Sequence, residues 1–102
     1  MRQVMVRYKV KPERVAENEA LVRAVYAELA RVNPEGLHYA TFRLEDGVSF
    51  MHIAVTTDGG NPLPELDAFQ RFQADIAERC DEPPVVSELS EVGSFRFTWS
   101  SP

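Results

Sequence analysis

The most constraining feature of the sequence is a β-hairpin pattern between Tyr39 and Val55, centred on the dipeptide Asp46-Gly47. An Asp-Gly pair favours a two-residue type I′ turn, because both central residues of that turn need a positive φ, which Gly and Asp tolerate. A two-residue turn also fixes the register of the strands on either side of it. The predicted cross-strand pairs are Leu44 with Ser49, Phe42 with Met51, Ala40 with Ile53, and His38 with Val55.

This register divides the hairpin into two faces of different character, since successive side chains of a strand point to opposite sides. One face carries the four predicted pairs and is nearly all apolar. The other face mixes aromatic and polar side chains, namely Tyr39, Thr41, Arg43, Phe50, His52 and Ala54. We interpret the mixed face as a surface that meets another protein surface, because it is too apolar for water and too polar for a core.

Four further segments complete the order of elements. Gln3–Val10 alternates as a strand with one apolar side, and Val85–Trp99 is rich in β-branched and aromatic residues, with an expected bend at Gly93. Glu13–Val32 and Glu65–Arg79 carry apolar residues at helical spacing. The order strand, helix, strand, strand, helix, strand predicts an α+β, ferredoxin-like βαββαβ fold, with an antiparallel sheet and both helices on one face.

The helices need an apolar sheet face to cover, and one set of residues fits: Val4, Val6, Tyr8, Val10, Phe42, Met51 and Ile53. A monomer would leave the mixed face in water, so we predict a homodimer in which two sheets stack face to face. Its interface residues would be Arg7, Tyr39, Arg43, Phe50 and His52. The end of the last strand, Phe95–Trp99, is expected to reach toward the partner subunit. A solvated sheet face is the alternative, since antiparallel sheets often have one.

Length and composition narrow the class of protein. With 102 residues, we expect a single domain over residues 1–102. A net charge of −5 without a basic stripe argues against a nucleic-acid partner, and no apolar run is long enough to span a membrane. Cys80 is the only cysteine, which indicates a reducing compartment, so we expect a cytoplasmic protein. Cys80 itself is expected to be a small buried hydrophobic residue.

Polar residues on faces that should be apolar point to a candidate pocket. Asn18 falls within the apolar stripe of the first helix, and Gln73 does so on the second. Tyr8 and His38 lie on the predicted helix-facing side of the sheet. Each residue has a purely structural alternative, such as a hydrogen bond to a nearby backbone group. Their convergence on one space nevertheless predicts a small-molecule pocket with apolar walls, because an unpaired buried amide or imidazole is costly.

No metal-binding or phosphate-binding motif is visible. His38 and His52 lie on opposite faces of the predicted hairpin, so they cannot share an ion, and neither has a His or Cys at ligand spacing. Gly59-Gly60 leads into Asn-Pro and not directly into a helix, which is not the pattern of a phosphate-binding loop.

Three segments resemble the antibiotic biosynthesis monooxygenase-type domains of the dimeric α+β barrel superfamily: YATFRLEDGVSF at 39–50, FQRFQ at 69–73 and VVSELSEVGSFRF at 85–97. The resemblance implies a homodimer with a ligand pocket between sheet and helices in each subunit. It also implies enzymes that oxygenate polycyclic aromatic or quinol-type substrates without a cofactor. The haem-degrading branch is not matched residue by residue, since Val6 stands near its strand Asn and the second helix has no His.

The resemblance implies chemistry in which the substrate is deprotonated and the anion reacts with O₂. His38 is the candidate base, with Asn18 and Gln73 as candidates to hold the anionic oxygen. A non-catalytic ligand-binding or interaction module is one alternative. An isomerase or lyase using the same pocket is another, and the sequence does not decide among the three.

Overall fold

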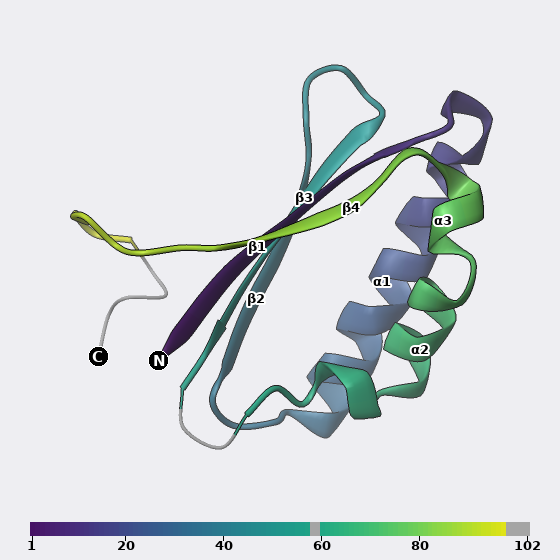
Figure 1. Cartoon of the computed structure of the whole chain (residues 1–102). Coiled ribbons are helices and arrows are strands. Elements are labelled where there is room, and N and C mark those ends of the chain that lie inside the picture. The colour runs from purple at the N-terminus through teal and green to yellow at the C-terminus, as the bar shows by residue number, and fades with distance from the viewer. Residues whose placement is uncertain (58–59, 98–102) are drawn as a thin grey trace.

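The structure is a computed structural model that describes residues 1–57 and 60–97 (Figure 1). Its strands pair in the antiparallel order β2-β3-β1-β4, and its helices lie along one side of the sheet (Figure 1). The predicted ferredoxin-like α+β fold is therefore confirmed. The elements in chain order are β1 (Arg2–Val10), η1 (Pro12–Arg14), α1 (Val15–Val32), β2 (Leu37–Arg43), β3 (Ser49–Thr56), η2 (Leu63–Glu65), α2 (Asp67–Ala74), α3 (Ile76–Arg79) and β4 (Cys80–Glu88).

The first helical region matches the sequence pattern closely. Pro12 begins a short 3₁₀ turn, which continues into α1. Asn18, Val22 and Val25 form the buried side of the helix. The helix ends at Asn33, which has a left-handed φ of 49° and donates its backbone N–H to the carbonyl of Leu29.

The second half of the chain departs from the prediction in two places. The expected helix over Glu65–Arg79 is interrupted at Asp75, where φ is −122°, and this gives α2 and the short α3. The last strand begins at Cys80 and includes Pro83 and Pro84, which an edge strand tolerates because its outer N–H groups need no partner.

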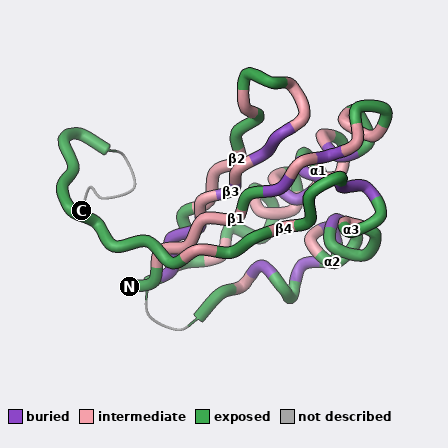
Figure 2. The backbone as a smooth tube through the Cα atoms, turned by 45° about the horizontal axis from the view of Figure 1, so that its top comes forward, coloured by how far each residue is buried: buried purple, intermediate pink, exposed green. Residues whose placement is uncertain are grey.

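The predicted strand over Val85–Trp99 is wrong in its extent, because β4 ends at Glu88. Residues 89–97 form no strand and are exposed, and they lead away from the body of the molecule (Figures 1 and 2). The expected bend at Gly93 therefore has no strand to bend. Trp99 lies outside the described residues. Cys80 is buried, as expected.

The hairpin has the predicted register and a different turn. Phe42 pairs with Met51 and His38 with Val55, as predicted. The Gly47 N–H donates to the Leu44 carbonyl at 3.0 Å, so Glu45 and Asp46 are the central residues of the turn. Gly47 is the residue of this turn that takes a positive φ, of 80°. The type I′ prediction is thus wrong.

Asp46 stabilises this turn with its side chain rather than with a left-handed backbone. Its carboxylate accepts hydrogen bonds from the backbone N–H groups of Val48 and Ser49 and from the Ser49 hydroxyl. These bonds, led by the one from the Ser49 hydroxyl, lower the pKa of Asp46 to about 2. An Asp that bonds its own backbone two residues on is a common turn former, which explains why the sequence signal and the turn type disagree.

The two hairpin faces are the reverse of the prediction. β1 and β3 pair so that Tyr8 opposes Phe50 and Val6 opposes His52. Directly opposed residues share a face, so the helix-facing side of β1 brings Phe50 and His52 with it. Phe50 is 3% exposed and His52 4% exposed, which places both in the interior of this chain.

The sheet face away from the helices exposes large apolar side chains. Phe42 is 47% exposed and Val85 64% exposed. We call this surface the open face and define it by Met5, Arg7, His38, Phe42, Met51, Ile53 and Val85. The predicted core positions Phe42, Met51 and Ile53 are therefore wrong, whereas Val4, Val6, Tyr8 and Val10 do face the helices. The strand β4 beside this face is largely exposed along its length (Figure 2).

Candidate functional site

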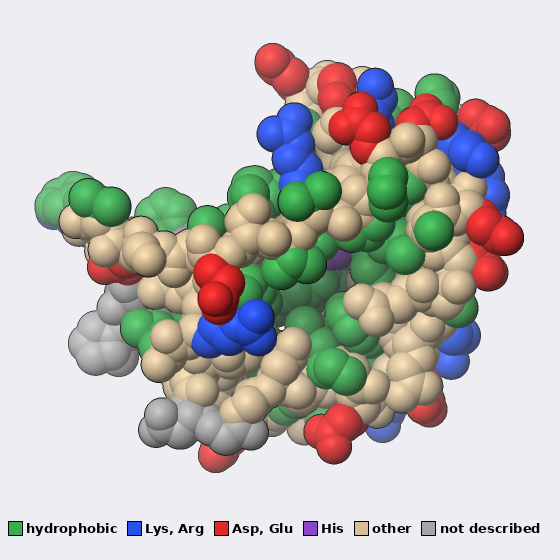
Figure 3. Space-filling view, viewed as in Figure 1, with side chains coloured by type: hydrophobic (Ala, Val, Ile, Leu, Met, Phe, Trp, Pro, Cys, Tyr) green, Lys and Arg blue, Asp and Glu red, His purple; other side chains and the backbone are tan. Residues whose placement is uncertain are grey.

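A cavity of about 280 Å³ lies between the sheet and the α2 region. Figure 3 shows a hollow whose walls are mainly hydrophobic, with histidine atoms visible deep inside it. Its polar lining comes from few side chains, namely Arg2, Tyr8, Tyr39, His52, Asn61 and Gln73. The apolar lining residues include Val4, Val6, Ala54, Leu63, Phe69, Phe72 and Ile76. Apolar walls with a few placed polar groups are typical of a small-molecule site.

Aromatic rings surround His52 on several sides. Its ring centroid lies 5.3 Å from that of Tyr8, 5.7 Å from Tyr39 and 5.4 Å from Phe72. Phe69 extends this wall, at 6.0 Å from Phe72. Rings at these distances offer flat, polarisable surfaces, which suit an aromatic ligand.

His52 is held by hydroxyl groups on both of its ring nitrogens. Nε2 lies 2.8 Å from Tyr8 Oη. Nδ1 lies 2.6 Å from Tyr39 Oη and 3.0 Å from Thr41 Oγ1. Thr41 Oγ1 in turn lies 2.8 Å from Tyr26 Oη, so a line of hydrogen bonds runs from the cavity wall to α1.

A buried arginine is connected to these hydrogen bonds through Asn18. Asn18 Nδ2 donates to Tyr8 Oη at 3.0 Å, and Asn18 Oδ1 accepts from Arg79 Nε at 3.2 Å. Arg79 is 1% exposed, donates through Nη2 to the Phe72 carbonyl at 2.7 Å, and places its guanidinium 5.4 Å from the centre of the Phe72 ring. Among the described residues, no carboxylate lies within ion-pair distance of Arg79. Its hydrogen bonds within the described residues thus go to neutral acceptors, and its guanidinium also contacts an aromatic ring.

Burial keeps the titratable groups of the site neutral. It lowers the pKa of His52 to about 4, because the charged imidazolium loses hydration there. Burial likewise raises the pKa of the Tyr8 and Tyr39 hydroxyls well above their usual value. At neutral pH the site thus presents an uncharged imidazole between two uncharged phenols.

The predicted site residues are only partly brought together. Tyr8 lines the cavity, and Asn18 lies directly behind it. Gln73 lines the cavity from its exposed mouth and is not buried. His38 is exposed on the open face, so its placement in the pocket is wrong.

The predicted dimer interface is also largely wrong. Arg7 does lie on the open face and is exposed. Phe50 and His52 are buried within the chain, and Tyr39 bonds to His52. Arg43 pairs with Glu19 of α1 at 2.7 Å, which places it on the helix side. The register of β1 against β3 is the physical reason, because it fixes which hairpin face the helices cover.

Of two further functional candidates, the sequence analysis placed His52 in the dimer interface and missed Arg79. His52 shares a strand face with Thr41 and Tyr39, whose hydroxyls can satisfy an imidazole, so a buried histidine was readable there. Arg79 had no such signal. An arginine at a helix end ordinarily matches the helix dipole and stays in water.

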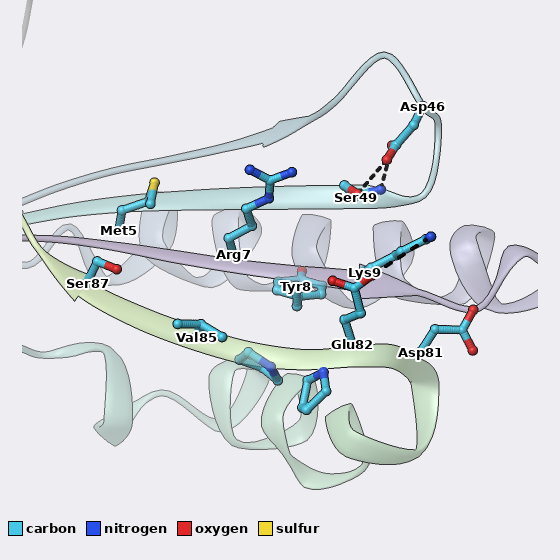
Figure 4. Close-up of a pocket in the computed structure, with 12 residues that line it drawn as sticks. Met5, Arg7, Tyr8, Lys9, Asp46, Ser49, Asp81, Glu82, Val85 and Ser87 are labelled. Atoms are coloured by element: carbon cyan, nitrogen blue, oxygen red, sulfur yellow. Dashed lines mark hydrogen bonds and ion pairs between the residues drawn. The ribbon is translucent and has the colours of Figure 1, made fainter.

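A second cavity, of about 620 Å³, lies near the Asp46 turn and is lined mainly by residues of β1 and β4 (Figure 4). It mixes charges of both signs, and Lys9 Nζ lies 3.9 Å from a Glu82 carboxylate oxygen. Met5, Arg7 and Val85 of the open face line it as well. We regard it as part of that face, because a protein surface stacked on the open face would cover it.

Comparison with known proteins identifies the fold. No family model and no curated protein sequence matches the chain. An antibiotic biosynthesis monooxygenase of known structure aligns with a TM-score of 0.71 at 22% identity, over 91% of this chain and 100% of that one. Rv0793 from Mycobacterium tuberculosis aligns with a TM-score of 0.72 at 16% identity, over 91% and 96%. A proposed antibiotic biosynthesis monooxygenase from Nitrosomonas europaea gives 0.72 at 15%, over 89% of each chain. The chain thus has the fold of the antibiotic biosynthesis monooxygenase-type domains.

Within residues 1–57 and 60–97, no three or more His, Cys, Asp or Glu side chains are grouped so as to hold a metal ion. None of the helices described there has the length and apolar character needed to cross a membrane.

Proposed function

We propose that this protein is a homodimer that binds a small aromatic or quinol-like molecule and oxygenates it without a cofactor. One observation carries the proposal: the cavity between sheet and helices combines aromatic walls with a neutral His52 held between the Tyr8 and Tyr39 hydroxyls. Proteins named as antibiotic biosynthesis monooxygenases share the fold, which supports the reaction class.

The chemistry asks little of the protein beyond binding and proton transfer. A hydroxyl or an acidic CH₂ of the substrate loses a proton, and the resulting electron-rich anion reduces O₂ itself. Where a CH₂ becomes a carbonyl, one oxygen atom enters the product and the other leaves as water, so no external reductant is needed. The aromatic walls orient the substrate and exclude water from the anion.

His52 takes the role of base that the sequence analysis assigned to His38. It is the imidazole that lines the cavity, and its neutral form dominates at physiological pH. Because both ring nitrogens are engaged by hydroxyls, the substrate proton would reach His52 through the Tyr8 hydroxyl that bonds to Nε2. A pKa of about 4 makes it a weak base toward a free proton. A substrate anion formed beside it would offset this weakness, because the imidazolium and the anion attract each other in a site of low dielectric.

The open face supports the homodimer. Phe42 and Val85 expose much of their apolar surface there, with Met5, Met51 and Ile53 between them. A two-fold dimer in which each open face meets its copy would bury this patch. The exposed segment after β4 carries Phe95, which we propose packs on the partner subunit. The cytoplasm is the proposed compartment, since Cys80 is a buried free thiol.

A non-catalytic binding protein is the second candidate, and the His52 site itself favours it. Both ring nitrogens of His52 are already engaged by hydroxyls, and burial disfavours its protonated form. A site of this kind can recognise a ligand without taking a proton from it.

Oxygen uptake separates the two functions. We would measure O₂ consumption with a panel of hydroquinones and anthrones, with and without protein, and compare His52→Gln with the matched control His38→Gln. The monooxygenase proposal expects protein-dependent uptake that falls at least about tenfold in His52→Gln and is unchanged in His38→Gln. Binding of these compounds without O₂ uptake would establish the second candidate instead.

A further inference from the structure

Arg79 gives the hydrogen bonds around His52 a fixed direction. A guanidinium has only donors, so the Asn18 atom that faces Arg79 Nε must be the amide oxygen. The Asn18 NH₂ group then faces Tyr8 and donates to its oxygen. The amide group of Asn18 could take either orientation in a symmetric environment. Here Arg79 determines which orientation it takes.

The direction of hydrogen-bond donation is also determined between Tyr8 and His52. Tyr8 Oη contacts Asn18 and His52 within the described part of the chain. Because its oxygen accepts from Asn18, its own hydrogen goes to His52 Nε2, 2.8 Å away. If Nε2 carried a proton instead, Tyr8 would accept twice and its buried hydrogen would have no acceptor, which costs about 1–3 kcal/mol. The ring proton of neutral His52 therefore belongs on Nδ1.

By the same reasoning, Tyr39 does not donate its hydroxyl hydrogen to His52. The Nδ1–H group donates to Tyr39 Oη, the shorter of its two contacts at 2.6 Å, compared with 3.0 Å to Thr41. The Tyr39 O–H then points away from the imidazole. Thr41 is the neighbouring acceptor for it, and a ligand oxygen in the cavity that Tyr39 lines can replace Thr41.

We propose that Arg79 and Asn18 are positioning residues that hold His52 in its Nδ1–H tautomer and so make Tyr39 a hydrogen-bond donor to the ligand. The cavity then selects ligands with an acceptor oxygen, such as the carbonyl of an aromatic ketone or quinone. This ligand class shares one assumption with the proposed function, namely that the ligand binds in this cavity. The tautomer does not depend on any ligand.

The tautomer is tested by NMR of protein with ¹⁵N-labelled histidine, in which the ring ¹⁵N shifts show which nitrogen carries the proton. Wild-type His52 is expected as the Nδ1–H tautomer, with exposed His38 as the internal reference. Asn18→Asp replaces the donor to Tyr8 by an acceptor of nearly the same shape, paired with Arg79. Tyr8 then donates to the carboxylate, and His52 should switch to the Nε2–H tautomer.

A wild-type His52 in the Nε2–H form overturns the proposal, whatever happens to the variant. A folded Asn18→Asp that keeps the Nδ1–H form also overturns it, because the direction would then not come from Asn18. Tyr39→Phe is the matched control. It should leave the Nδ1–H tautomer unchanged, since Thr41 Oγ1 still accepts from Nδ1.

The ligand class is tested with 1-tetralone and tetralin, two bicyclic molecules that differ in a single carbonyl oxygen. Wild-type protein should bind 1-tetralone about five- to tenfold more tightly, the worth of one hydrogen bond. Tyr39→Phe should bind both with similar affinity. Equal wild-type affinities, or a preference that survives in Tyr39→Phe, would overturn the ligand class. Absence of O₂ uptake with other substrates would count against the oxygenase alone.

Discussion

The two faces of the sheet contrast in a way that simple hydrophobicity does not anticipate. Between the covered face and the helices lie a histidine, four hydroxyl side chains, an amide and an arginine, all within the line that runs from Arg79 to Tyr26. The open face carries Phe42, Met51, Ile53 and Val85 with no helix over them. Buried polar groups thus lie on the covered face, and large apolar side chains are exposed on the face that this chain leaves uncovered.

The two faces also differ in their surroundings within this chain. Within the described residues no buried side-chain nitrogen or oxygen lacks a hydrogen-bond partner. Satisfied polar groups of this kind can shape a cavity without unfolding the chain. On the open face the apolar groups are exposed, and the proposed dimer would bury them. The predictions below test these two roles separately.

The largest expected effect is the loss of an amide on the covered face. Asn18→Leu should lower the free energy of unfolding by about 3 kcal/mol, because it leaves the Arg79 Nε–H and the Tyr8 oxygen without their partner in the interior. Gln73→Leu, at the exposed mouth of the cavity, should change it by less than about 0.5 kcal/mol. Urea denaturation of the two variants measures the difference. Equal losses would mean that burial does not separate the two amides.

His52 should make stability depend on pH between its unfolded and folded pKa values. Burial lowers its pKa from 6.5 to about 4. Between these values the unfolded chain binds a proton that folded His52 does not, so stability falls as the pH falls, by on the order of 3 kcal/mol in total. The check is urea denaturation from pH 7 to pH 4, in wild type, His52→Gln and His38→Gln.

His52→Gln should remove this component of the pH dependence, whereas His38→Gln should retain it. The difference between wild type and His52→Gln isolates the histidine from the carboxylates. Asp46, for example, stabilises the fold above its unfolded pKa of 3.8 and loses that contribution only as the pH falls toward about 2. An unchanged slope in His52→Gln would show that His52 titrates normally and is not held in a dry site.

Substitutions on the open face should weaken the proposed dimer and should affect subunit stability little. Phe42→Glu should weaken the proposed dimer about 30-fold, equivalent to the roughly 2 kcal/mol of one buried aromatic side chain. The fold of the subunit should change little, since Phe42 is 47% exposed. Val32→Glu is the matched control, because Val32 is 46% exposed at the end of α1. Sedimentation velocity over a concentration series gives both affinities, and parallel losses would argue against the open face as the interface.

The sequence was sufficient for the fold and for the pairing within the hairpin. Strand and helix periodicities identified the element order, and Asp46-Gly47 placed the turn closely enough to give the pairs Phe42–Met51 and His38–Val55. It was insufficient for the choice of faces. That choice depends on which residue of β1 lies opposite Phe50, a long-range register that no local pattern records.

For the site, too, local signals were predicted correctly and long-range contacts were not. Tyr8 and Asn18 were found because a polar group on an apolar stripe is a local signal. His52 was assigned to the wrong environment, because its partners Tyr8 and Tyr39 come from other strands and make it acceptable in the interior only after folding. Arg79 was missed, since its acceptors are an amide in another helix and a backbone carbonyl, Asn18 and Phe72.

The smallest expected effect concerns the segment that follows β4. Deleting the chain from Ser94 onward should leave subunit stability within about 0.5 kcal/mol, because residues 89–97 are exposed and form no strand. If Phe95 packs on the partner subunit, the deletion should weaken the dimer about tenfold, or about 1.4 kcal/mol. Phe95→Ser in the full chain should reproduce most of that loss, whereas Glu91→Ser in the same exposed segment should not. Measured by sedimentation velocity, an unchanged dimer affinity in the truncated chain would assign the interface to the open face alone.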